Sequence, residues 1–160
     1  MQLRIRRAQP SECALTKEWF VENHYLDEGV AISAFVLEFL AGDGELVGAM
    51  ILGSPHGAGL DGDRILELYR VYFIDGTDRF IESRSLGMMR KFVRTWCPQI
   101  KLMLSYSDPS VGHRGTIYEA DGWAPFGHTK RESGAGWGRH KGRNRKPRSI
   151  SSKVRWVRTP

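Results

Sequence analysis

The stretch "ESRSLGMMRKFVRTW" at residues 82–96, followed by "IKLMLSYS" at residues 100–107, decides the fold. In its first part, apolar residues recur at intervals of three and four, which predicts an amphipathic helix with one buried face. The residues predicted on that face are Leu86, Met89, Phe92, Val93 and Trp96. Pro98 ends the helix, and the apolar run that follows it predicts a buried strand. This change from helical to strand spacing predicts an α/β domain.

The flanking segments predict that this helix and strand belong to one sheet-based domain. Upstream, two segments rich in β-branched and aromatic residues flank the turn "GDG" at 42–44, which predicts a hairpin. The predicted strands are 3–8, 32–41, 45–53, 64–75, 100–107, 123–128 and 151–158, and the further predicted helices are 11–24 and 115–120. We therefore expect an α/β (α+β) fold with a mixed, mostly antiparallel central sheet and helices on both faces.

The composition is typical of a soluble globular chain of one domain. The 160 residues are 41% hydrophobic and 26% charged, which are ordinary values. No apolar run reaches the roughly 18 residues needed to span a bilayer, and the amino terminus lacks the apolar region of a signal peptide. Cys13 and Cys97 form neither a disulfide framework nor a metal motif. We therefore expect free thiols in a reducing cytoplasm and no membrane partner.

Positive charge is concentrated near the carboxyl terminus. Residues 130–160 hold 11 Lys and Arg against the single acid Glu132, a net charge of +10, whereas residues 1–129 carry −4. Such a segment is typical of a polyanion-binding surface, because neutralised phosphates release counterions; the alternative is a solvated basic tail. We expect residues 1–129 to form the core, and residues 130–160 to add a basic Gly/Arg-rich loop and a last strand. The candidate DNA-binding residues are Arg139, Lys141, Arg143, Arg145, Lys146 and Arg148.

The order of the predicted elements resembles that of the GNAT acyltransferases. In that superfamily a strand leads into a helix whose first turn holds the pyrophosphate of coenzyme A, since free backbone N–H groups and the helix dipole favour an anion. The superfamily pattern "[QR]-x-x-G-x-[GA]" corresponds to "RSLGMM" at 84–89, in which Met replaces the last small residue. The resemblance implies acetyl-CoA or another acyl-CoA as cofactor. It assigns cofactor binding to Arg84, Ser85, Leu86 and Gly87.

A closer resemblance covers most of residues 20–128. The motifs "NHYL", "LVGAMILGSP", "LYRVYF", "ESRSLG" and "YSDPSVGHRGTIYEADGW" occur in the order and spacing of the phage Mom family. That family is a divergent GNAT branch, and it implies a phage-encoded enzyme in a bacterial cytoplasm. Its activity converts adenine in double-stranded DNA to N6-(methylcarbamoyl)adenine, which protects the DNA from restriction. One departure is Tyr69, where similar sequences usually have Ser.

Two residues of the last motif are the main catalytic candidates. Asp108 follows a predicted central strand, where a carboxylate is well placed to accept a proton from an attacking amine. The alternative for Asp108 is a turn, since Asp-Pro commonly opens one. The resemblance gives Tyr118 the role of protonating the departing CoA thiolate, and a phenol suits that leaving group. The alternative for Tyr118 is packing of the short helix on the sheet.

The resemblance adds three further site residues, each with a structural alternative. Ser83 would contact cofactor or substrate, although helix capping alone explains a serine there. Arg70 would pair with a phosphate or carboxylate, whereas an arginine within a strand is most often solvated. His113 would contact substrate or orient Asp108, or it is a loop histidine without either role.

Iron enters only through the resemblance. Mom proteins share the pair His24 and Tyr25, and imidazole, phenolate and the Asp108 carboxylate would make a reasonable set of iron ligands. The alternative is that His24 merely interacts with the end of the first helix.

The sequence is compatible with three functions. The first is a Mom-like enzyme that modifies adenine in double-stranded DNA with an acyl-CoA. The second is a conventional GNAT N-acetyltransferase acting on a protein or small-molecule amine. The third is a non-catalytic DNA-binding protein on a GNAT fold. The amine of a paired adenine is not free to react, so the first function implies that the base leaves the duplex.

Overall fold

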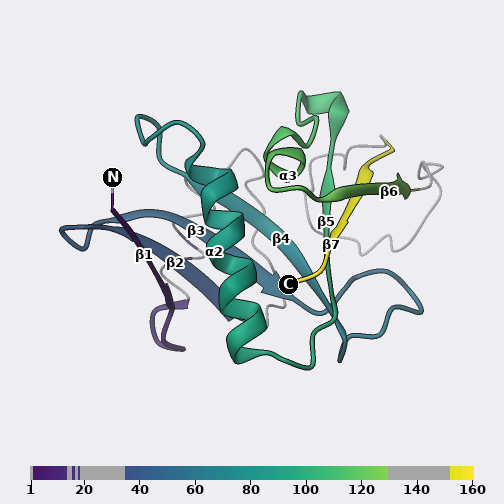
Figure 1. Cartoon of the computed structure of the whole chain (residues 1–160), viewed down its shortest axis with the longest axis horizontal. Coiled ribbons are helices and arrows are strands. Elements are labelled where there is room, and N and C mark those ends of the chain that lie inside the picture. Colours follow the sequence, from purple (N-terminus) through teal and green to yellow (C-terminus); the bar gives the residue numbers. More distant parts are fainter. Residues whose placement is uncertain (1, 14–15, 17, 19–34, 130–151) are drawn as a thin grey trace, which may run out of the picture.

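The computed structural model describes residues 2–13, 16, 18, 35–129 and 152–160. Within these residues, one sheet has the strand order β1-β2-β3-β4-β5-β7-β6 (Figure 1). Its strands are β1 (Leu3–Arg7), β2 (Phe35–Ala41), β3 (Leu46–Gly53), β4 (Ile65–Phe73), β5 (Leu102–Ser107), β6 (Ala124–His128) and β7 (Val154–Arg158). The helices are α2 (Ile81–Trp96), the 3-10 turn η1 (Pro109–Val111) and α3 (Thr116–Ala120).

The sheet is mixed and mostly antiparallel, as predicted. Every neighbouring pair of strands is antiparallel except β4 and β5, which are parallel and are connected through α2. Because α2 carries the chain back along the sheet, the start of α2 and the end of β5 lie at the same end of the sheet. The predicted last strand, β7, lies between β5 and β6, so the carboxyl-terminal strand is an internal part of the sheet.

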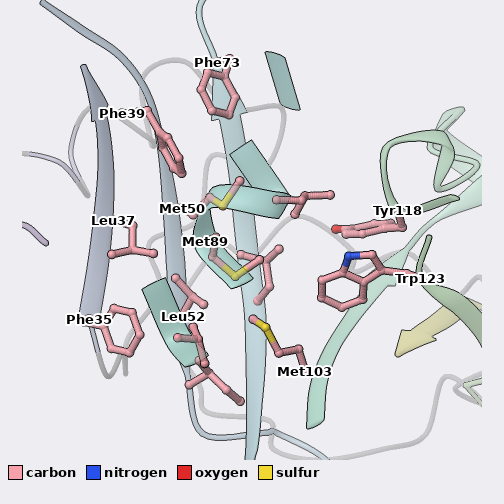
Figure 2. Packing of buried hydrophobic residues seen from close by; sticks show 14 of the residues in the cluster. Phe35, Leu37, Phe39, Met50, Leu52, Phe73, Met89, Met103, Tyr118 and Trp123 are labelled. Carbon is pink, nitrogen blue, oxygen red and sulfur yellow. The ribbon is translucent and has the colours of Figure 1, made fainter. Parts of the chain in front are cut away.

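The main core lies between the sheet and α2. The buried residues of α2 are Ile81, Ser85, Leu86, Met89 and Val93. They pack on apolar side chains of β2 to β5, and Tyr118 and Trp123 close one end of the same cluster (Figure 2). The predicted helical face is therefore confirmed at its centre.

The predicted face is wrong at its end, because Trp96 is 71% exposed and Phe92 is only half-buried. The buried row continues at four-residue steps and finishes at Val93. Trp96 therefore lies beside the face that meets the sheet.

The opposite face of the sheet has a smaller core of Ala8, Val36, Ala49 and Ile51. Cys13 packs against it, and Thr16 donates a hydrogen bond of 2.5 Å to the buried carboxylate of Glu38 on β2. Residues 13, 16 and 18 are helical, while most of the helix predicted at 11–24 lies outside the described residues. These contacts place helical residues on the second face too, as predicted.

Candidate functional site

The parallel strands β4 and β5 pair over only part of their length. Ile65 to Leu68 pair with Leu102 to Ser105, and beyond these residues the two strands lean apart (Figure 1). We call this part of the sheet, residues 69–73 of β4 and 106–108 at the end of β5, the β4–β5 fork. The start of α2 and the helix α3 lie at the same end of the sheet (Figure 1).

The hydroxyl of Tyr118 lies where the fork begins. Ser105 Oγ is 2.8 Å from the Tyr118 hydroxyl oxygen and 3.0 Å from the carbonyl oxygen of Leu68. A carbonyl oxygen can only accept, so the single hydroxyl hydrogen of Ser105 goes to Leu68. The phenol of Tyr118 then donates to Ser105 Oγ. Ser105 therefore positions the acidic hydrogen of Tyr118 at the last paired residues of β4 and β5.

The ring of Tyr118 is held by two tryptophans. It stacks on Trp156 of β7, with centroids 5.8 Å apart and planes at 28°, and it lies 5.4 Å from the ring of Trp123. Tyr118 is 8% exposed. The packing alternative thus describes its ring, while its hydroxyl reaches the fork.

Glycine at position 115 allows α3 to approach the sheet. Gly115 precedes α3 with φ of 84°, and a Cβ there would lie 2.3 Å from the Trp156 ring. Trp156 is itself fixed, because its indole Nε1 donates to Ser107 Oγ at 2.9 Å. The position of Tyr118 therefore depends on a residue without a side chain.

An ion pair that the sequence analysis missed holds the other end of α3. Arg90 of α2 donates from Nε and Nη2 to the two carboxylate oxygens of Asp121, both at 2.8 Å. Trp123 Nε1 also donates to Asp121, at 2.9 Å. The hydrogen bonds that Arg90 donates to the Asp121 carboxylate raise the pKa of Arg90 above its ordinary value. The acid within "YEADGW" was a possible signal, but its partner lies 31 residues earlier.

Asp108 closes the turn that leaves β5. It is 6% exposed, and its Oδ1 accepts hydrogen bonds from the backbone N–H of Ser110 at 3.0 Å and from Ser110 Oγ at 2.5 Å. The backbone N–H of His113 donates to the Asp108 carbonyl oxygen, and the side chain of His113 is exposed. The turn alternative is thus observed, at the last residue of the fork.

Free backbone N–H groups occur only in the first turn of a helix, and most of the predicted CoA-binding residues lie after the first turn of α2. The helix begins at Ile81, so the backbone N–H groups of Ser85, Leu86 and Gly87 lie within the intrahelical ladder. The backbone N–H of Arg84 donates to the carbonyl oxygen of Phe80 at 3.0 Å. The backbone N–H of Ile81 also donates, to the carbonyl oxygen of Asp78 at 3.1 Å, so residues 82 and 83 of the first turn are the part of α2 suited to an anion.

The side chains of these residues also differ in environment. Ser85 is fully buried, and among the described residues its Oγ has no hydrogen-bond partner. A Cβ at Gly87 would lie 3.5 Å from Asp121 Oδ1, an ordinary van der Waals contact, so this position of α2 lies next to the end of α3 without requiring a glycine. Ser83 does not cap the helix, because its Oγ donates to the Phe80 carbonyl oxygen at 3.1 Å. Arg84 lies 3.6 Å from Asp78 in an exposed ion pair.

Arg70 lies in β4 next to an irregularity of the sheet. The register between β3 and β4 shifts between Ile51 and Leu52, so Tyr69 is an extra residue on β4. Arg70 Nη1 donates to the Tyr69 carbonyl oxygen at 3.0 Å, and the side chain is half-buried. The structure therefore places Arg70 within the fork, beside the bulge.

The departure at Tyr69 has a structural consequence. Its hydroxyl donates to the carbonyl oxygen of Ser54, and its ring lies 4.5 Å from that of His56. Burial, and to a smaller extent the carboxylate of Glu67, raise the pKa of Tyr69. Tyr69 thus ties β4 to the loop after β3.

Several predicted residues lie outside the described residues. These are the candidate iron ligands His24 and Tyr25 and the six candidate DNA-binding residues Arg139, Lys141, Arg143, Arg145, Lys146 and Arg148. Within the described part of the chain, no three His, Cys, Asp or Glu side chains are grouped to hold a metal ion. Among the helical residues that the structure describes, none forms a span long and apolar enough to cross a membrane.

Solved structures share the fold across almost the whole chain. An acetyltransferase of the GNAT family from Streptococcus pneumoniae has a TM-score of 0.66 and 11% identity, covering 99% of both chains. Aminoglycoside acetyltransferase AAC(6')-Ib, bound to coenzyme A and kanamycin, has a TM-score of 0.66 and 12% identity, with 99% of this chain and 95% of that chain covered. The spermidine/spermine N-acetyltransferase SpeG from Vibrio cholerae has a TM-score of 0.65 and 10% identity, with coverage of 99% and 95%. At these identities, the likeness shows the GNAT acetyltransferase fold.

The sequence comparison is more specific. No curated protein matches the sequence. The Mom protein family matches residues 4–159, from the first strand of the sheet to the end of the last. This chain therefore belongs to the Mom protein family, with a GNAT fold.

Proposed function

We propose that this protein transfers an acyl group from an acyl-CoA to the N6 amine of adenine in double-stranded DNA. Membership of the Mom family and the acetyltransferase fold support this function. The observation that carries the proposal is the Tyr118 hydroxyl, which Ser105 holds at the beginning of the β4–β5 fork. A buried phenol held in place by a second hydroxyl can act as a general acid once its hydrogen turns from Ser105 to the leaving group.

The proposed transfer uses two proton transfers. The N6 amine of adenine attacks the thioester carbonyl carbon, a C–N bond forms, and the C–S bond then breaks. Tyr118 gives its phenolic proton to the departing thiolate, while Asp108, directly or through water, takes the proton that the amine loses. The hydroxyl of Ser105 can turn from Leu68 to the phenolate and stabilise it until the proton is replaced.

The acyl-CoA would be held near the start of α2. Ser83 and Arg84 lie in the first turn, where backbone N–H groups and the helix dipole favour a phosphate. Arg84 adds a positive charge at an exposed position. The acyl group would then reach the fork from the same end of the sheet.

The DNA would be held by the basic segment. Residues 130–160 carry a net charge of +10, and the six candidates between Arg139 and Arg148 account for much of it. Since the target amine is paired within a duplex, the base must leave the stack before it can react. His113 is exposed on the loop between η1 and α3 and would contact such a substrate.

The product depends on chemistry beyond acyl transfer. Transfer from acetyl-CoA gives N6-acetyladenine, whereas a methylcarbamoyl group contains an additional nitrogen. Iron would supply that chemistry if His24, Tyr25 and Asp108 bind it. Of these three, Asp108 is described, and its Oδ1 already accepts two hydrogen bonds from Ser110. A carboxylate that binds a cation is also a weaker base, so the two roles of Asp108 oppose each other.

The alternative functions are separated by a thiol-release assay. Purified protein with acetyl-CoA should release CoA when duplex DNA is added, and not when kanamycin or spermidine is added. Release with either small amine would favour a conventional N-acetyltransferase. Salt-dependent DNA binding without release would favour a non-catalytic DNA-binding protein.

Two tyrosine variants sharpen that assay. Tyr118→Phe keeps the ring between its tryptophans and loses the acidic hydroxyl, so we expect release to fall by about 100-fold or more. Tyr106 follows Ser105 in β5, so its side chain points to the other face of the sheet. Tyr106→Phe removes a hydroxyl there and should leave the release of CoA unchanged. Equal release by wild type and Tyr118→Phe would contradict the acid role.

A further inference from the structure

Phe80 is an exposed aromatic residue held in an unfavourable backbone conformation. It directly precedes α2 with φ of 67° and ψ of 17°, in the left-handed region. Within the described residues, every other residue with positive φ is a glycine. The Phe80 side chain is nevertheless 59% exposed. A bulky residue in this conformation is a genuine outlier that a glycine would relieve.

Neither helix formation nor packing explains this phenylalanine. The position before a helix favours Ser, Thr, Asp or Asn, whose side chains cap free N–H groups, and Phe80 makes no such bond. The next residue, Ile81, is 1% exposed and already supplies the apolar anchor of the first turn. The ring contact that the structure records is with the guanidinium of Arg79, 4.7 Å from the ring centroid. Strained residues of this kind gather at functional sites.

Phe80 lies at the end of the sheet that carries the proposed reaction. Its carbonyl oxygen accepts hydrogen bonds from Ser83 Oγ and from the backbone N–H of Arg84. The start of α2 and the end of β5, where Asp108 lies, are at the same end of the sheet (Figure 1). On the turn that follows Asp108, Val111 is a second exposed apolar side chain. Two exposed apolar side chains therefore lie at this end of the sheet, one directly before α2 and one on the turn after β5.

We propose that Phe80 stacks on a base of the DNA substrate and holds the target adenine out of the duplex; this inference rests on the proposed function. A flat ring with a guanidinium beside it offers one surface to a base and one charge to the adjoining phosphate. Apolar side chains that enter a base stack separate neighbouring bases and support an extruded one. The side chain is largely exposed to solvent, where a duplex can contact it.

Phe80→Gly tests this role without the usual risk of unfolding. Glycine relaxes the positive φ, so the melting temperature should stay the same or rise. The probe is a mixed-sequence duplex in which 2-aminopurine replaces adenine. Binding of wild type should increase the fluorescence emission of 2-aminopurine, because the base leaves the stack in which its fluorescence is quenched. Phe80→Gly should bind about tenfold or more weakly and lose most of that increase. Phe80→Trp should retain both.

Three controls separate the Phe80 ring from phosphate contacts, from an exposed aromatic elsewhere on α2 and from cofactor binding. The salt dependence of DNA binding should be the same in Phe80→Gly and wild type, because phosphate contacts remain. Trp96→Ala removes an exposed aromatic from the far end of α2 and should leave binding and emission unchanged. The acetyl-CoA dissociation constant should be equal in wild type and Phe80→Gly.

Several results would overturn the inference. One is unchanged DNA affinity and 2-aminopurine emission in Phe80→Gly, and another is no increase in emission with wild type. Two more concern Phe80→Gly: weaker binding of acetyl-CoA while DNA binding stays intact, or a marked fall in melting temperature. The proposed reaction fails separately. If emission depends on Phe80 but DNA releases no CoA, the base-stacking role stands and the reaction does not. If DNA causes release of CoA while the emission does not depend on Phe80, the reaction stands and the base-stacking role does not.

Discussion

The residues around Tyr118 show how much a local motif can reveal. The pattern "YEADGW" pointed to Tyr118 as a leaving-group acid, and the structure places its hydroxyl at the fork. Ser105 carries no motif, because it is one polar residue in an apolar strand. Its role depends on where the pairing of β4 and β5 ends, which is at Leu68 and Ser105. The sequence does not reveal this position. A partner brought in by strand register is invisible to spacing along the chain.

Tyr69 gives a prediction about pH at the same scale. Its pKa is raised above the usual value near 10, so the folded state holds the phenolic proton more tightly than the unfolded state does. The stability that this adds is present below pH 10 and is lost as pH rises through the raised pKa. Wild type should therefore lose stability relative to Tyr69→Phe as pH increases above about 10.

Urea unfolding of wild type and Tyr69→Phe at several pH values between neutral and alkaline checks this effect. The difference between the two free energies of unfolding, wild type minus variant, should become smaller or reverse at high pH. A difference independent of pH would mean that the Tyr69 hydroxyl titrates alike in both states.

At the scale of the element, α3 is a short helix that depends on its neighbours. Isolated helices of this length are not stable in water, so its packing must fix it. The stack on Trp156 holds one end and the Arg90–Asp121 pair holds the other. The sequence predicted the existence of α3 from residues 115–120, and the structure has it at Thr116–Ala120. It could not predict the salt bridge, which joins residues far apart in the chain.

Two glycine substitutions test the attachment of α3. Gly115→Ala places a methyl group 2.3 Å from the Trp156 ring and also strains a φ of 84°, so it should cost about 3 kcal/mol of folding stability. Gly112→Ala is the matched control, because its φ is 85° but no described residue lies within 4 Å of the added carbon. It should cost about 1 kcal/mol. Urea unfolding measures both, and equal losses would contradict the close contact with Trp156.

The start of α2 shows the limit of motif matching for elements. The helix was predicted from Glu82 and begins at Ile81, which is close agreement. The superfamily pattern, however, assigned cofactor contacts to Ser85, Leu86 and Gly87, whose backbone N–H groups lie inside the helix. A pattern gives residue types, whereas free N–H groups depend on the residue at which the helix starts.

At the scale of the whole molecule, the sequence predicted the type of sheet and not the order of its strands. The alternation of residues 151–158 indicated a last strand, but nothing in it indicates insertion between β5 and β6. This order matters for experiments on the basic segment. Removing residues 130–160 would delete the internal strand β7 together with the positive charge. Substituting the six candidates between Arg139 and Arg148 by Gln leaves β7 in place.

The most direct test of the account is nucleoside mass spectrometry of DNA from bacteria that express this protein. We expect deoxyadenosine carrying an acetyl or methylcarbamoyl group with wild type, and about 100-fold less or none with Asp108→Ala or Tyr118→Phe at equal expression. The variant with six Gln substitutions should give less product, since duplex binding is weakened. Unmodified deoxyadenosine in cells that contain folded wild-type protein would contradict the proposed function, and equal modification by wild type and Tyr118→Phe would contradict the site.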